Sequence, residues 1–194
     1  MGEVIYHQDK SFESVNFNGK TLIDREFNNC TFINCNFAES VLNDNIFDEC
    51  VFENCDFSMS SFLSTGLNKV RFIGCKLMGV DFANCNKLMF SPSYDNCIMD
   101  YCSFYGARLK NTSFVKCSLM EVDFCEADLT SACFKESDLI GATFSNTVLK
   151  KADFRQAQNI AIDPEHNSLA KAKFTIDQLE GLLYKYNLEV DNNF

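Results

Sequence analysis

Cysteine and histidine are the side chains of this sequence that could support catalysis or metal binding. The 194-residue chain has 11 Cys but only two His, and His7 and His166 lie at opposite ends, so no Ser–His–Asp or Cys–His set can form within one chain. The cysteines recur at intervals of twenty residues, with one interval of 22, in place of the short spacings of a zinc site. One such series is Cys35, Cys55, Cys75, Cys97 and Cys117. We therefore expect no enzyme, no metal and no cofactor, and we interpret most cysteines as small core residues, with Cys125 and Cys133 pointing outward.

Acidic side chains are the other abundant reactive groups. The chain carries 27 Asp and Glu against 17 Lys and Arg, a formal net charge of −10, which disfavours direct binding to nucleic-acid phosphates. Solubility alone is the simplest interpretation of such a charge. No stretch approaches 18 apolar residues, and residues 1–11 lack the basic and apolar regions of a signal peptide. The sequence therefore predicts a cytoplasmic protein with no membrane span.

Phe or Leu occupies every fifth position along most of the chain. An α-helix would spread residues at this spacing around its circumference, and a straight strand would alternate them between its two faces. The two runs are Phe12, Phe17, Leu22, Phe27, Phe32, Phe37, Leu42, Phe47, Phe52, Phe57, Phe62, Leu67, Phe72, Leu77 and Phe82, then Phe104, Leu109, Phe114, Leu119, Phe124, Leu129, Phe134, Leu139, Phe144, Leu149 and Phe154. A chain that buries these residues must turn once per five residues toward a common axis, which predicts a solenoid.

Two sets of residues recur every twenty residues, which predicts a coil with four sides. One set is the cysteine series above. The other is an aromatic series: Phe12, Phe32, Phe52, Phe72, Tyr94, Phe114, Phe134 and Phe154. Most repeats place a small residue two positions before the core residue, as a narrow interior requires. Residues 12–154 then make about seven turns, roughly 34 Å tall at about 4.8 Å per turn. We number the faces by their first core residue: Phe12 for the first, Phe17 for the second, Leu22 for the third and Phe27 for the fourth.

Both series require two extra residues within 85–95. Pro92 lies in this segment, and Lys87 stands where a core residue is due, so we expect the segment to bulge outward. A second interruption covers 157–167, after which Leu169 and Phe174 restore the register. We expect residues 1–10 to form an N-terminal cap and residues 11–174 the coil.

The C-terminal segment, 175–194, is expected to form a capping α-helix and a tail. Thr175 and Gln178 have the spacing of a capping box, and apolar residues follow at helical intervals. A dimer contact is expected at Leu179, Leu182, Leu183 and Tyr186.

Several five-residue units resemble the A-(D/N)-(L/F)-X-X repeat of the pentapeptide-repeat proteins. Examples are Ala127–Ser131, Ser137–Gly141 and Ala152–Gln156, and the resemblance extends over residues 11–174. It implies a right-handed quadrilateral β-helix. The expected fold class is therefore an all-β solenoid with a short C-terminal capping α-helix.

The length and the C-terminal pattern resemble those of the quinolone-resistance and microcin-immunity subgroup. That resemblance implies a non-enzymatic homodimer that mimics duplex DNA and binds DNA gyrase or topoisomerase IV. The longer quinolone-resistance members carry projecting loops tied to topoisomerase contact, whereas here the interruption within 85–95 adds only two residues to the coil. The alternative is a structural or scaffolding β-helix with a different protein partner.

A DNA mimic should gather its acids on one side of the coil, and this sequence does so. The second and third faces carry ten acids and a single base, Lys76, while the other two faces carry acids and bases in equal number. The acids are Glu39, Asp56, Asp100, Glu121 and Asp138 on the second face and Asp24, Asp44, Asp81, Asp123 and Glu126 on the third. Ten charges over about 34 Å give one per about 3.4 Å, close to one strand of duplex DNA. We expect these acids to bind a protein partner with a basic groove.

Overall fold

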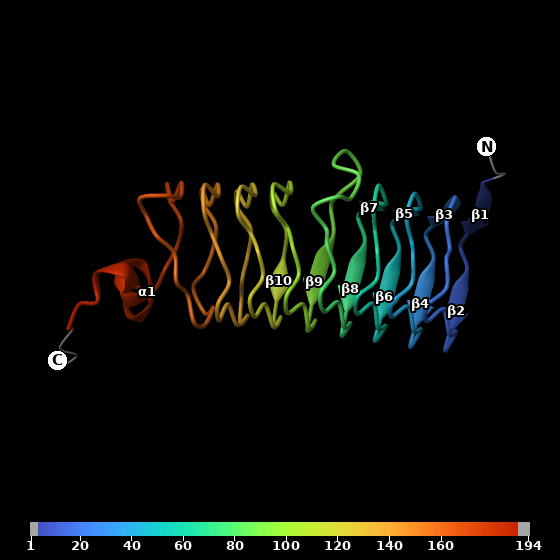
Figure 1. Ribbon diagram of the computed structural model, residues 1–194, viewed down its shortest axis with the longest axis horizontal. Helices are drawn as coiled ribbons and strands as arrows, with labels where there is room; N and C mark the ends of the chain where they lie inside the picture. Colours follow the sequence, from blue (N-terminus) through green and yellow to red (C-terminus); the bar gives the residue numbers. More distant parts are fainter. Residues whose placement is uncertain (1–3, 190–194) are drawn as a thin grey trace.

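The chain winds into a four-sided parallel coil, seen from the side in Figure 1. The computed structural model describes residues 4–189, so residues 1–3 of the predicted N-terminal cap and 190–194 of the predicted tail lie outside the described residues. Each turn pairs with the next in parallel. The register is twenty residues before and after the extra residues, as Phe12 pairs with Phe32 and Phe32 with Phe52, and 22 residues where Phe72 pairs with Tyr94. The predicted all-β solenoid is confirmed.

Within residues 4–189, the regular strands lie on two of the four faces. The fourth face holds a sheet ordered β1 (Ile5–Gln8), β3 (Arg25–Asn28), β5 (Ile46–Asp48) and β7 (Gly66–Asn68). The first face holds β2 (Ser11–Glu13), β4 (Thr31–Ile33), β6 (Val51–Glu53), β8 (Arg71–Ile73), β9 (Ser93–Asp95) and β10 (Phe114–Val115). Single parallel bridges join the turns on the second and third faces, and on every face beyond β10.

The core consists of aromatic rings stacked along the coil. The Phe32 and Phe52 rings lie 4.7 Å apart between centroids and nearly parallel, while Phe52 meets Phe57 of the adjacent face edge to face at 5.0 Å. Phe52 and Phe57 are both fully buried. Both arrangements are favourable for aromatic pairs. The predicted column of Phe12, Tyr94 and their equivalents therefore exists, and Phe174 extends it by stacking on Phe154 at 5.1 Å.

Each corner is made by the residue two positions after a core residue. This residue adopts a left-handed backbone, with φ of 57° at Glu39, 57° at Asp44 and 58° at Met59. The left-handed residue turns the chain from one face to the next and leaves its side chain outside the coil. The corners therefore display whichever side chains the sequence places at this position.

The small inward residues also form hydrogen bonds. Thr65 Oγ1 donates to the Leu42 carbonyl oxygen, 23 residues earlier, at 2.7 Å, and the Cys75 thiol donates to the Phe52 carbonyl oxygen at 3.3 Å. Asn45, which is not a small residue, fits this slot because its Nδ2 donates to the carbonyl oxygens of both Leu22 and Leu42. This slot therefore favours a compact donor.

The extra residues near position 88 project from the fourth face as the green loop at the top of Figure 1. Phe90 bridges to Leu67 and packs against the core, so it takes the core position expected for residue 87. Leu88, in the loop, is 88% exposed. After the loop, the aromatic column of the first face continues, since Tyr94 pairs with Phe72 before the loop and with Phe114 after it.

Three short helical segments close the C-terminal end: η1 (Ile176–Gln178), α1 (Glu180–Leu183) and η2 (Tyr184–Tyr186). The Thr175 backbone N–H donates to Gln178 Oε1 at 2.9 Å, and the Gln178 Nε2 donates to the carbonyl oxygens of Phe154 and Ala157. Gln178 thus supplies the donor that a further turn would give to the Ala157 carbonyl oxygen, and adds a second donor to the Phe154 carbonyl oxygen, which already accepts from the Ala157 backbone N–H.

Candidate functional site

Parallel bridges place the acids of the second face along one side of the coil. Asn36, Asp56, Lys76, Ile98, Ser118 and Asp138 form a continuous ladder. Glu39 and Glu121 lie at the corners, with left-handed backbones, and Asp100 follows the core residue Met99. All five predicted acids of this face are on the surface, half-buried or exposed.

The third face has the same construction. Its ladder runs through Val41, Ser61, Asp81, Ser103, Asp123 and Thr143. Asp24, Asp44 and Glu126 are left-handed corner residues with exposed side chains. The Glu126 carboxylate raises the pKa of the Tyr105 hydroxyl on the neighbouring turn.

Several of these aspartates also support the local turn. Asp56 Oδ1 accepts a hydrogen bond from the Ser58 backbone N–H at 2.9 Å, and Asp123 Oδ1 accepts one from Cys125 at 2.9 Å. Such Asx turns favour Asp at the position before the core residue, whatever the face. The turn therefore explains why Asp recurs at this position, but it does not explain why the ten acids make no salt bridges within residues 4–189.

Ion pairs occur on the first and fourth faces and near the C-terminal end of the described chain, but not on the acidic faces. Within residues 4–189, none of the ten predicted acids makes a salt bridge. The carboxylates that do are Glu49, Asp128, Glu136, Asp153, Asp163 and Glu165. The acidic faces therefore carry uncompensated negative charge.

Asp153 on the first face shows the contrast. It makes the same turn as Asp123, yet Arg155 lies 2.7 Å and Lys173 3.4 Å from its Oδ2. The hydrogen bond from Arg155 lowers the pKa of Asp153 to about 2. Asp153 on the first face is therefore paired with basic side chains, whereas Asp123 on the third face makes the same turn without a salt bridge.

The four residues predicted for a dimer contact lie on the C-terminal helical segments. Leu179, Leu183 and Tyr186 are exposed by 46%, 41% and 51%, whereas Leu182 packs against the core. The Tyr186 hydroxyl donates to Glu165 Oε1 at 2.8 Å. Three of the four side chains therefore face outward at this end, and Leu182 anchors the segment to the coil.

A salt-bridge cluster fixes the same segment. Lys185 Nζ lies 2.8 Å from Asp163 Oδ1 and 2.7 Å from Glu165 Oε2. These contacts raise the pKa of Lys185 and lower those of both carboxyls. The cluster joins η2 to the 157–167 interruption.

The thiols occupy the positions expected from the sequence. Nine cysteines are buried, and Cys125 and Cys133 are half-buried on the outside of the coil. Within residues 4–189 no group of three His, Cys, Asp or Glu side chains is arranged to hold a metal ion. Over the same residues, no helix has the length and apolarity needed to cross a membrane.

Comparison with known proteins identifies the repeat. A family model for the pentapeptide repeat region matches residues 25–88 and 87–161. No curated protein matches the sequence. Among solved structures, a trypsin-treated variant of QnrB1, a plasmid-mediated fluoroquinolone resistance protein, is 21% identical with a TM-score of 0.56, over 97% of this chain and 98% of that one.

A second similar structure has a different described role. HetL, from the cyanobacterium Nostoc sp. strain PCC 7120, is described as involved in the regulation of heterocyst differentiation. It is 17% identical with a TM-score of 0.54, over 87% of this chain and 84% of HetL. At these identities the two structures are similar to this chain in fold.

Proposed function

This chain belongs to the pentapeptide-repeat family, with the right-handed quadrilateral β-helix of its members, and from that premise we propose that it is a DNA-mimicking protein that binds a type II topoisomerase. The partner is DNA gyrase or topoisomerase IV, the setting is the cytoplasm, and the protein acts without catalysing a reaction.

The observation that carries the proposal is the uncompensated charge of two adjacent faces. Ten carboxylates follow the second and third faces, and none of them makes a salt bridge within residues 4–189. Turns about 4.8 Å apart place these charges at intervals comparable to those of a phosphate backbone. A protein groove that attracts DNA would attract this surface as well, and salt would weaken both interactions.

Competition with DNA would explain an effect on quinolones. A quinolone acts on a topoisomerase that holds cleaved DNA, so a protein that occupies the DNA-binding groove reduces the amount of that complex. Resistance to quinolones, or to other topoisomerase poisons, is the cellular effect that we propose.

A homodimer would lengthen the charged surface. Leu179, Leu183 and Tyr186 expose apolar area at the C-terminal end, and a two-fold axis there would place two coils end to end. Light scattering tests this arrangement: a mass near 44 kDa, twice the 22.1 kDa of one chain, is expected, and about 22 kDa would contradict the dimer.

Supercoiling by purified gyrase tests the central proposal. Added protein at micromolar concentration should inhibit supercoiling and, in the presence of a fluoroquinolone, reduce the amount of cleaved DNA. The absence of both effects, with gyrase and with topoisomerase IV, would overturn the proposal. It would leave a scaffolding role with another partner, for which HetL shows that the same fold can serve a different process.

A further inference from the structure

Exposed apolar side chains gather on the two acidic faces. Between residues 12 and 174, Leu88 of the projecting loop is the exception among the exposed large hydrophobic residues. The others all lie on the second or third face: Ile23, Met59, Leu63, Ile98, Tyr101, Tyr105, Met120 and Ile140. Isolated exposed hydrophobic residues are ordinary, but their restriction to one side of a coil is not.

The second face holds the densest group, which we call the apolar strip: Met59, Met78, Ile98, Tyr101, Met120 and Ile140. Backbone hydrogen bonds join its members across neighbouring turns, from Met59 N–H to the Met78 carbonyl oxygen at 2.8 Å and from Tyr101 N–H to that of Met120 at 2.8 Å. The Tyr101 hydroxyl lies 3.8 Å from the Met120 sulfur. The strip therefore contains two apolar pairs on successive turns, Met59 with Met78 and Tyr101 with Met120, and Asp100 lies between the two pairs.

The Met59 side chain covers the space left by Gly79, which has no side chain, on the next turn. It lies over Gly79, where a Cβ would meet the Met59 sulfur at 2.5 Å. Gly79 has a φ of 70°, so glycine suits both the backbone and the methionine above it. Met59 therefore covers the corner of the turn that lies between its own turn and that of Tyr101.

The fold does not require apolar residues at these positions. Earlier turns of the second face carry Asn18, Ala38 and Ser58 in the column that later holds Met78, Asp100, Met120 and Ile140. The side chains of the strip point away from the core, with exposed fractions of 67% for Met59 and 58% for Tyr101. Imitation of the charge of DNA does not require these exposed apolar side chains.

Charge surrounds the strip. Asp56, Asp100, Glu121 and Asp138 lie on the same face, and none of them makes a salt bridge within the described part of the chain. An apolar centre with a charged rim is the usual anatomy of a protein–protein interface, in which Tyr and Met are enriched.

We infer that the apolar strip is the anchor of a protein interface whose partner presents an apolar surface bordered by Lys and Arg. The inference rests on the proposed function in one respect, that a partner binds the acidic faces. The carboxylates attract the partner and determine its association rate, while the apolar strip determines its dissociation rate. The interface therefore differs from a DNA contact in retaining part of its affinity at high salt.

A triple variant of the strip tests this with gyrase. Tyr101→Ser, Met120→Ser and Ile140→Ser together remove exposed apolar area and leave every charge in place. Where the wild type binds gyrase, we expect at least tenfold faster dissociation and an unchanged association rate. The matched control, Ile5→Ser, Tyr6→Ser and Leu88→Ser, removes three exposed apolar side chains outside the acidic faces and should bind as the wild type does.

The outcomes separate this inference from the proposed function. If wild type and triple variant bind gyrase equally, the inference is overturned and the topoisomerase proposal stands. If the wild type does not bind gyrase or topoisomerase IV, the topoisomerase proposal is overturned, and a synthetic probe decides the inference.

The probe is an 18-residue helical peptide with Leu along one face and Lys along the other, compared with an oligolysine of the same charge. We expect the Leu-containing peptide to bind the wild type at least tenfold more tightly than oligolysine does, and the triple variant to lose that difference. Equal binding of the two peptides, or a difference that persists in the triple variant, would overturn the inference.

Discussion

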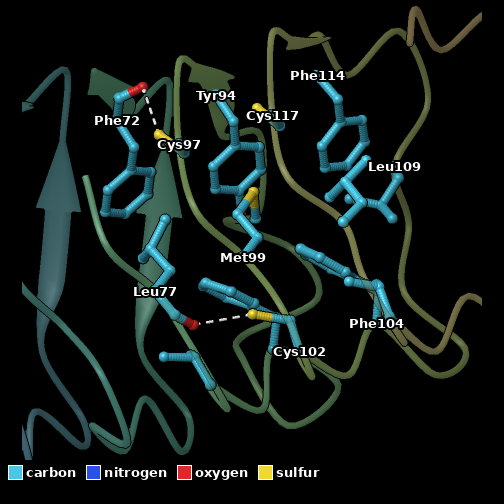
Figure 2. Packing of buried hydrophobic residues seen from close by; sticks show 14 of the residues in the cluster. Phe72, Leu77, Tyr94, Cys97, Met99, Cys102, Phe104, Leu109, Phe114 and Cys117 are labelled. Carbon is cyan, nitrogen blue, oxygen red and sulfur yellow. Dashed lines mark hydrogen bonds between the residues drawn. The ribbon is translucent and has the colours of Figure 1, made fainter. Parts of the chain in front are cut away.

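The Cys97 thiol donates a hydrogen bond to the Phe72 carbonyl oxygen, 25 residues earlier, at 3.4 Å (Figure 2). One turn before, Cys75 makes the same contact with Phe52 across 23 residues. The difference equals the two extra residues of the projecting loop. The loop therefore accommodates the two extra residues, and the cysteine column continues beyond it with the same contact.

Tyr94 lies in this core and predicts a stabilising substitution. Its ring stacks between Phe72 and Phe114, but among the described residues its buried hydroxyl has no hydrogen-bond partner. Removal of an unsatisfied buried hydroxyl should raise the free energy of unfolding by about 1 kcal/mol. Urea denaturation of Tyr94→Phe measures this, and a variant less stable than the wild type would contradict it.

The exposure of the thiols predicts their reactivity. At pH 8 a thiol reagent should label only Cys125 and Cys133 in the native protein, and all 11 cysteines in urea. Burial and the Asp123 carboxylate raise the pKa of Cys125, which slows its reaction. Mass spectrometry identifies the labelled sites, and the double variant Cys125→Ser, Cys133→Ser should remain unlabelled. Rapid labelling of a core thiol such as Cys75 would show that the coil opens.

Alkaline pH should destabilise the coil through its buried thiols. Burial raises the pKa of Cys50 from 9.0 to about 12. Above pH 9 the unfolded chain releases this proton and the folded chain keeps it, so stability is fully present below pH 9 and falls as pH rises toward 12. The slope is at most about 1.4 kcal/mol per pH unit for each such thiol.

Cys50→Ala is the control for this slope, because Ala132 and Ala152 occupy the same slot in later turns. The variant should show a shallower decline of unfolding free energy between pH 9 and 11 than the wild type. Parallel declines in the two proteins would mean that Cys50 ionises normally in the folded state.

Neutralisation of the third face should weaken topoisomerase inhibition. Asp81→Asn, Asp123→Asn and Glu126→Gln keep the oxygen acceptors of the turns and remove three charges. We expect inhibition of supercoiling to require at least tenfold more protein, because steering by charge is lost. Replacement of the same three residues by Lys should abolish it.

A matched control changes the net charge equally on the first face, with Glu13→Gln, Glu53→Gln and Asp95→Asn. These acids also make no salt bridge within residues 4–189. Inhibition should then stay within twofold of the wild type. An equal loss in both variants would indicate that net charge, and not the acidic faces, governs binding.

Gly181 should be essential to the C-terminal cap. A Cβ there would overlap the Ile160 carbonyl group, and the Ile162 backbone N–H donates to the Gly181 carbonyl oxygen at 3.0 Å. Gly181→Val should displace α1, increase hydrogen exchange at Ile162 at least tenfold and weaken the proposed dimer. Exposed Glu180→Ala is the control. Unchanged exchange in Gly181→Val would show that the cap adapts around the larger side chain.

The sequence was sufficient to predict the coil, because one residue type every five positions has few other physical solutions. The columns through Cys97 and Tyr94 followed from spacing alone. Spacing could not show that Phe90 takes the core position due at Lys87, since the length of the bulge left both registers possible. The hydrogen-bonding role of the cysteines was also hidden, because small size alone explained their positions.

The sequence predicted which charged residues lie on the candidate surface, but not their ion pairing or the apolar residues among them. Assignment of Asp81 or Glu121 to a face required no more than counting, but the absence of salt bridges depends on side-chain positions. The apolar strip was missed because only charged residues were assigned to faces, although Tyr101 and Met120 could have been assigned in the same way. Helical spacing likewise named Leu182 with Leu179 and could not say which of them turns inward.

The twenty-residue turn has a consequence for how such proteins diversify. In-frame duplication or deletion of one whole turn returns every remaining side chain to its original face, as the pairing of Phe32 with Phe12 and Phe52 requires. Descendants of one ancestral gene could thus differ in reach by steps of about 4.8 Å while inheriting the same interior.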